Sequence, residues 1–138
     1  MDSAQLADLL MQAAHRIRRG EKQAMAPLGL TPAQARALRV ILNAPEPPRM
    51  AALADALRIV PRSVTSVIDA LEREDLVTRA PDPGNRRAIL LHPTAKARGV
   101  GARMREARRI TAESLFAALS ETQRAELGTL LTALTADR

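Results

Sequence analysis

Two short helical patterns followed directly by two β-prone runs constrain the fold of this chain most strongly. The first helix is expected near 50–57 and the second over about 61–75, with Pro61 at its first position. In the second, the side chains at core-facing spacing are Val64, Val67, Ile68 and Leu71. The β-prone runs 76–79 and 87–91 flank a turn sequence rich in Pro, Asp, Gly and Asn. This order predicts a helix-turn-helix followed by a β-hairpin, or wing.

The remaining segments are also predicted to be helical. We expect helices over about 3–25, 31–44, 93–119 and 121–134, separated by Pro- and Gly-containing breaks. Thr31, Pro32 and Gln34 form the start signal of the second of these helices. Aromatic residues make up only 1% of the chain, so the core is built from aliphatic side chains, most of them good helix formers. We therefore expect one mainly α domain.

Basic residues are concentrated in one part of the sequence. The formal net charge is +6, and a basic balance favours polyanionic partners such as nucleic acid or a membrane surface. Between residues 76 and 109 the only acids are Asp82 and Glu106. The basic residues there are Arg79, Arg86, Arg87, Lys96, Arg98, Arg103, Arg105, Arg108 and Arg109. Most are Arg, which suits bidentate contacts to phosphate and guanine.

The second helix of the pair has a polar face opposite its apolar one. Its N-terminal part would present Arg62, Ser63, Thr65 and Ser66 outward. Hydroxyl groups and a helix N-terminus suit phosphates, and Arg62 could reach a base edge. An ordinary helical hairpin with a solvated polar face is an equally good interpretation of this segment alone.

The hairpin that follows favours DNA binding. Its turn ends in Arg86 and Arg87, a few residues after Arg79, and clustered like charges are costly unless an anion lies opposite. Arginine inserted into a narrow minor groove meets such a negative potential. The alternative is a solvated turn with incidental arginines. The helix pair and the basic hairpin together make DNA binding the better interpretation.

The chain resembles the multiple-antibiotic-resistance regulator (MarR) family over nearly its whole length. The most specific parts of the resemblance are the sequences RSVTSVIDALE, DLVTR and DPGNRRA. The resemblance implies a winged helix-turn-helix lobe at about 31–92 with a two-stranded β-wing. It also implies a dimerisation region formed by long terminal helices at about 3–25 and 93–135. All of this would form a single domain, 1–138.

The same resemblance implies a homodimeric transcriptional regulator that recognises specific sequences in double-stranded DNA. Such proteins are usually repressors that bind a palindromic operator, and a small ligand, commonly aromatic or phenolic, often releases them. By position, Arg62, Ser63, Thr65 and Ser66 would face the major groove or its flanking phosphates. Arg86 and Arg87 would serve the wing in the minor groove, and we group Arg79 with this DNA-binding set.

Several positions depart from the family pattern. The wing lacks one Arg and one Asp of the usual Asp-Arg-Asp-Arg-Arg sequence, which removes the expected partners of a wing salt bridge. Arg58 and Asp75 stand where Gly is common, so their backbone is strained if φ is positive. Val60 is a poor N-cap residue, and His92 before Pro93 predicts a weak start for the long helix.

A ligand pocket is implied between the dimerisation helices and the DNA-binding lobe. His15, Arg16 and Arg39 are the polar candidates to hold an anionic ligand, with solvated surface as the alternative for each. The shortage of aromatic residues removes stacking partners, so an unusual ligand, or none, is expected.

Other classes of function lack support in the sequence. Without cysteine there is no disulfide or thiolate site, and the two histidines have no metal-binding spacing, so we expect no metal and no cofactor. No nucleophile motif is present, so an enzyme is not expected. An early acid and late basic residues at the N-terminus are the reverse of a signal peptide, which favours a cytoplasmic protein. The alternatives to a specific regulator are a non-specific DNA-coating protein and a helical protein–protein module.

Overall fold

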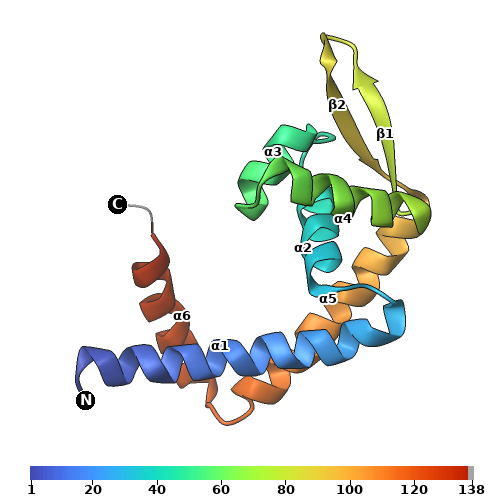
Figure 1. Cartoon of the computed structure of the whole chain (residues 1–138). Helices are drawn as coiled ribbons and strands as arrows, with labels where there is room; N and C mark the ends of the chain where they lie inside the picture. Colours follow the sequence, from blue (N-terminus) through green and yellow to red (C-terminus); the bar gives the residue numbers. More distant parts are fainter. Residues whose placement is uncertain (137–138) are drawn as a thin grey trace.

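The computed structural model describes residues 1–136, in which helices predominate and a single two-stranded antiparallel sheet projects from one end (Figure 1). The elements, in order, are α1 (Ser3–Met25), η1 (Ala26–Leu28), α2 (Pro32–Asn43), α3 (Met50–Leu57), α4 (Pro61–Arg73), β1 (Val77–Asp82), β2 (Asn85–Pro93), α5 (Ala95–Phe116) and α6 (Glu121–Thr135). The mainly α winged helix-turn-helix fold is thereby confirmed.

Reciprocal side-chain caps fix where three helices begin. The Thr31 hydroxyl accepts the backbone N–H of Gln34, whose side chain accepts the N–H of Thr31, as the sequence predicts. Asp2 and Ser120 form the same capping box at the starts of α1 and α6. Each box satisfies helix N–H groups that would otherwise lack a partner.

The start of α5 differs from the prediction. Strand β2 continues to Pro93, which pairs with Val77, so the helix begins at Ala95 rather than at Pro93. Thr94 caps it: the hydroxyl accepts the N–H of Ala97 and donates to the carbonyl of Asp75 at 2.7 Å. The expected weak cap was therefore wrong, because the polar residue lies one position after the proline. Two helix ends also fall short of the prediction, since α4 stops at Arg73 and α5 at Phe116.

The core lies where α2, α3 and α4 meet the base of the wing. Its most enclosed large side chains are Leu38, Ile41, Leu53, Ile68, Leu71 and Leu91. Burying one such side chain stabilises a fold by roughly 1.5–3 kcal/mol. Val64, Ile68 and Leu71 are fully buried as predicted, and Val67 packs against them half-buried. Ala54 of α3 is also buried.

The wing is longer than its sequence suggests. The strands run over Val77–Asp82 and Asn85–Pro93, with an irregularity between Pro81 and Asp82, so only Pro83 and Gly84 form the turn. The predicted strands were too short because a proline lies inside the first and two arginines begin the second. An isolated bridge between Arg49 and Leu90 joins the hairpin to the start of α3.

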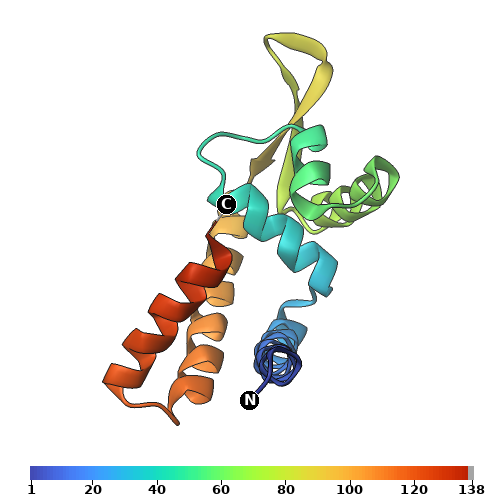
Figure 2. The same cartoon turned by 90° about the vertical axis from the view of Figure 1, so that its left-hand side faces the viewer.

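Helices α1, α5 and α6 extend away from this core (Figures 1 and 2). Helix α6 has no fully buried residue, and its Leu130 and Leu134 are 63% and 72% exposed. Further large apolar side chains on these helices are also exposed: Leu6, Leu9, Leu10, Met11 and Ile110. Within residues 1–136 of one chain, α1 and α6 therefore leave several large apolar side chains uncovered, and α5 leaves one.

The backbone is strained at both positions where a non-glycine residue replaces the glycine common in the family. Arg58 ends α3 with φ of 54°, and Asp75 follows α4 with φ of 59°. In this left-handed region a Cβ atom crowds the following carbonyl, at a cost of about 1–2 kcal/mol. Both residues hold their helix ends through backbone bonds, including Arg58 N–H to the carbonyl of Asp55.

Replacing Arg58 with Gly should therefore stabilise the protein. We expect Arg58→Gly to raise the free energy of unfolding by about 0.5–1 kcal/mol, because the relieved strain exceeds the extra unfolded-state entropy of glycine. Urea denaturation at pH 7 measures the change. Arg58→Ala retains the Cβ atom and should give no such gain; equal gains from both variants would contradict the strain argument.

Candidate nucleic-acid interface

The outward face of α4 carries the polar residues expected there. Arg62, Ser63, Thr65 and Ser66 are exposed, whereas the opposite face of the helix is buried in the core. The Thr65 hydroxyl donates to the carbonyl of Pro61 at 3.2 Å. No side chain caps the start of α4, since Val60 has no hydroxyl or carboxylate to do so. Pro61 has no N–H group, and those of Ser63 and Val64 donate to the carbonyl of Val60, so few amides at the start of α4 are left for an anion.

The start of α4 and the wing border the same hollow. A cavity of about 470 Å³ is lined by Pro61, Val64 and Thr65 of α4 and by Asn85, Arg87, Ala88 and Ile89 of the wing, with Arg49, Met50 and Ala51 between them. Both elements also project from the same lobe in Figure 2. Thr65 of the polar edge of α4 and Arg87 of the wing thus line the same hollow.

Arg49 and Asp82 hold the wing against the start of α3. The Asp82 carboxylate lies 2.7 Å from Nη2 of Arg49 and accepts from its Nε at 2.9 Å. The same carboxylate accepts the N–H of Gly84 in the turn. The Gly84 hydrogen bond, followed by that of Arg49, holds the pKa of Asp82 below its ordinary value. The wing salt bridge that seemed lost in the sequence is therefore present, with a partner 33 residues away.

Arg79 forms ion pairs with acidic residues of α4. Its guanidinium lies 2.6 Å from Oδ1 of Asp69 and 3.2 Å from Oε1 of Glu72, both on α4. These ion pairs join β1 to α4. They also neutralise two carboxylates on the helix that carries Arg62 and Ser66.

The basic stretch 76–109 does not form one continuous patch. Three of its arginines pair with acids that lie elsewhere or on their own helix: Arg79 as above, Arg108 with Glu21, and Arg109 with Glu106 and Glu113. Arg86 and Arg87 form no ion pair with any residue in 1–136. Within residues 1–136, the wing and α4 thus retain four cations without an ion pair: Arg62, Arg73, Arg86 and Arg87.

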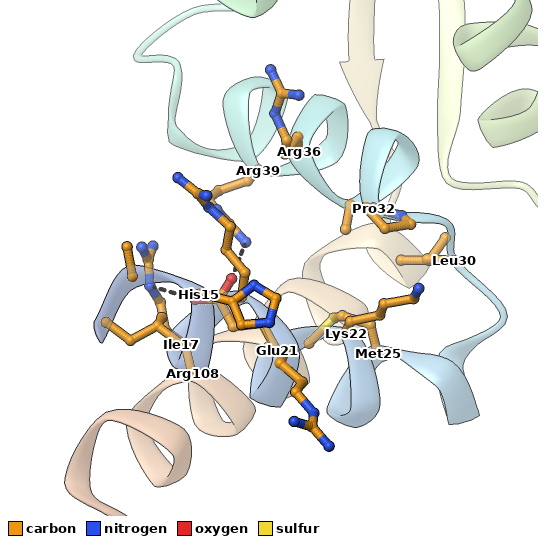
Figure 3. Close-up of a pocket in the computed structure, with 14 residues that line it drawn as sticks. His15, Ile17, Glu21, Lys22, Met25, Leu30, Pro32, Arg36, Arg39 and Arg108 are labelled. Atoms are coloured by element: carbon orange, nitrogen blue, oxygen red, sulfur yellow. Dashed lines mark ion pairs between the residues drawn. The ribbon is translucent and has the colours of Figure 1, made fainter. Parts of the chain in front are cut away.

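A larger cavity of about 690 Å³ lies where α1, α2 and α5 meet (Figure 3). His15 and Arg39 line it, whereas Arg16 does not. A ligand-holding role for each of these three residues stays a prediction. Sequence reasoning missed Glu21, Arg36 and Arg108, which do line the cavity.

Residues 1–136 contain neither a cluster of potential metal ligands nor a helix able to span a membrane. No three potential metal ligands among His, Asp and Glu cluster within residues 1–136. In the same residues, no helix is both long and apolar enough to cross a bilayer.

Comparison with known proteins places this fold. The model of the MarR family matches residues 28–88. MarR from Escherichia coli superposes with a TM-score of 0.85 at 22% identity, over 95% of this chain and 96% of that one. The predicted resemblance to the MarR family is confirmed. No curated protein sequence matches this chain significantly.

Two further solved structures extend the likeness over the whole chain. A MarR family regulator from Rhodococcus has a TM-score of 0.79 at 20% identity, covering 97% of this chain and 94% of its own. A MarR family protein from Mycobacterium tuberculosis, solved in complex with DNA, has a TM-score of 0.79 at 25% identity, covering 95% and 98%. The fold is that of MarR family transcriptional regulators, which are not enzymes.

The Arg49–Asp82 pair should govern the order of the wing. We expect Asp82→Asn to speed amide hydrogen exchange at residues 84–88, in the turn and the start of β2, at pH 7. Global stability should change little, because the pair lies at the surface and Arg49 is half exposed. The folded-state pKa of Asp82 is lowered, so this contribution is present above its ordinary value of 3.8 and is lost as pH falls through the folded value. The wild-type wing should therefore exchange faster, relative to the core, near pH 3. Unchanged exchange in Asp82→Asn would contradict this role.

Proposed function

We propose that this protein is a transcriptional regulator that binds specific double-stranded DNA as a homodimer, most simply as a repressor at a palindromic operator in the cytoplasm. The observation that carries the proposal is that the start of α4 and the wing border one hollow. Arg62, Arg86 and Arg87, which these two elements carry, are exposed and form no ion pair within residues 1–136. The M. tuberculosis relative solved with DNA supports the same conclusion.

The two elements suit different parts of a duplex. We assign Arg62, Ser63, Thr65 and Ser66 to the major groove and its flanking phosphates, since a helix of this kind reads base edges from its N-terminal residues. Arg86 and Arg87 extend to the neighbouring minor groove. Arg79 is assigned a positioning role, because its guanidinium is already held by Asp69 and Glu72.

A homodimer gives the uncovered apolar faces a partner. Leu6 and Leu10 of α1, Ile110 of α5, and Leu130 and Leu134 of α6 are exposed in one chain. Contiguous exposed apolar surface of this kind marks an interface. We assign the terminal helices, about 3–25 and 93–135, to dimerisation and residues 31–92 to the DNA-binding lobe. Two lobes held roughly 34 Å apart would require an inverted repeat.

The cavity between α1, α2 and α5 is a candidate effector site. It lies between the dimerisation helices and the helix that supports the recognition lobe, so a bound molecule touches both parts. A ligand that favours one arrangement of these parts over another would shift DNA affinity.

Salt-dependent binding to a selected duplex tests the main proposal. We expect one dimer to bind each inverted repeat recovered from a random pool, with a steep negative slope of log affinity against log salt by fluorescence anisotropy. Arg86→Ala should weaken binding and reduce the magnitude of the slope by about 1. Arg103→Ala, which removes an exposed arginine on α5, is the matched control and should change neither. A flat slope would refute DNA binding, and equal affinity for all sequences would indicate a DNA-coating protein.

Arg79 should act by masking charge rather than by contacting DNA. Arg79→Ala exposes Asp69 and Glu72 on α4, and we expect the dissociation constant for the selected duplex to rise at least tenfold at low salt. Adding Asp69→Asn and Glu72→Gln to that variant should recover most of the affinity. If the triple variant stays as weak as Arg79→Ala alone, then the arginine contacts DNA directly.

A further inference from the structure

The cavity between α1, α2 and α5 gathers like charges from neighbouring turns of its helices. Arg18 and Lys22 are four residues apart on α1, and Arg36 and Arg39 are three apart on α2. Like charges at these spacings repel each other on a helix surface. Arg19 and Arg108 also line the cavity, so six cationic residues border one space. Such an arrangement is stabilised when an anion lies among them.

Glu21 is the one carboxylate that lines this cavity among the described residues. Its side chain is only 16% exposed and lies between the arginines of the two neighbouring helices (Figure 3). Oε1 lies 3.0 Å from Nε of Arg108, and Oε2 lies 3.8 Å from Nη2 of Arg39. Despite these close charges, the buried Oε1 accepts no well-directed hydrogen bond. Buried polar atoms without a partner are rare and need a reason.

Arg39 and Arg108 both contact Glu21 with poor hydrogen-bond geometry. The 3.8 Å separation from Arg39 is too long for a hydrogen bond, and the Arg108 contact is close but badly aligned. A guanidinium binds best when two parallel N–H groups meet one acid group. Glu21 is thus a weak internal counter-anion, which an incoming acid group with better geometry can displace.

Arg36 extends the cavity toward the helix-turn-helix. Its Nη2 donates to the carbonyl of Leu57 at 3.2 Å, and Leu57 is the last residue of α3 before the strained turn at Arg58. An anion that draws Arg36 into the cavity would remove this bond. The same anion, by taking Arg39 and Arg108 from Glu21, would break the ion pairs that join α1 to α2 and to α5.

We propose that this cavity binds an organic polyanion, with two or more carboxylate or phosphate groups on an aliphatic frame, in competition with Glu21. The inference rests on the proposed effector role of the site and names its ligand class. Two anionic groups are needed because the cations stand in pairs on separate helices. An aliphatic frame suits the apolar lining of Ala14, Ile17, Met25, Leu30, Pro32 and Ala35, which contains no Phe, Tyr or Trp; the His15 imidazole is the one ring on the cavity wall. The volume of about 690 Å³ suits a small molecule.

Three probes with the same six-carbon frame test the ligand class. Calorimetric titration of the wild-type protein without DNA, at constant ionic strength, would compare hexanoate, adipate and hexane-1,6-diol bisphosphate. We expect adipate or the bisphosphate to bind at least tenfold more tightly than hexanoate, and the tighter of the two identifies the acid group. Binding of all three with equal affinity, or of none, would overturn the inference.

Substitution at Glu21 tests the competition. Glu21→Gln keeps the shape of the side chain but removes its charge, so the tighter probe should bind at least threefold more strongly than to wild type. Glu46→Gln, in the exposed loop before α3, removes the same charge elsewhere and should leave affinity unchanged. If Glu21 had only a structural role, Glu21→Gln would lower the melting temperature and leave the affinity for the probe unchanged. Arg39→Gln should weaken binding at least tenfold whether or not Glu21→Gln folds well.

The DNA proposal and the ligand proposal can fail separately. Arg86→Ala should weaken duplex binding without changing the calorimetric affinity for the probe, since the wing is not part of the cavity. If wild type binds its duplex but no dianion, the ligand inference is wrong and the regulator assignment stands. If wild type binds the dianion but no duplex, the regulator assignment is wrong and the ligand inference stands.

Discussion

The buried apolar face of α4 is the contact on which the rest of the lobe depends. Val64, Ile68 and Leu71 lock this helix against α2 and α3 and leave no freedom to rotate about its axis. A helix presents opposite faces at fixed spacing, so burying one face determines which residues meet solvent. The exposure of Arg62, Ser63 and Ser66 is therefore a consequence of packing, not of their own interactions.

Ion pairs then place the wing relative to that helix. Arg49 ties Asp82 to the start of α3, while Arg79 ties β1 to Asp69 and Glu72 of α4. Each pair is partly exposed and contributes little to global stability. Their effect is geometric: a two-stranded hairpin is marginal by itself, and these contacts hold it beside the α4 N-terminus. A surface for a duplex needs both elements held in a fixed relation.

The terminal helices differ from the lobe, because many of their apolar side chains are exposed within one chain. Within one chain α6 buries no residue completely, although Leu127 and Leu131 are half-buried. Leu130 and Leu134 remain open, as do several apolar residues of α1. The cationic cavity lies at the junction between these helices and the lobe, and Glu21 is its internal counter-charge. Two kinds of contact join the parts there: the ion pairs of Glu21 and the apolar packing of Met25, Ala97 and Met104 into the core.

Local rules in the sequence determined the helices, their caps and the inward face of α4, because capping, proline position and helical periodicity act over a few residues. The sequence by itself also determined which residues form the polar edge at Arg62, and it placed Arg86 and Arg87 in the hairpin, where they lie in β2 rather than in the turn. Only the tertiary structure decided which arginines are free. The partners of Arg79, Arg49 and Arg108 lie 7 to 87 residues away along the chain, and charge pairing depends on distance in space, which sequence spacing does not encode. Arg16 and Glu21 are five residues apart on α1, yet Glu21 lines the cavity and Arg16 does not. The sequence alone could not distinguish them, because the cavity forms only where α1 packs against α2 and α5.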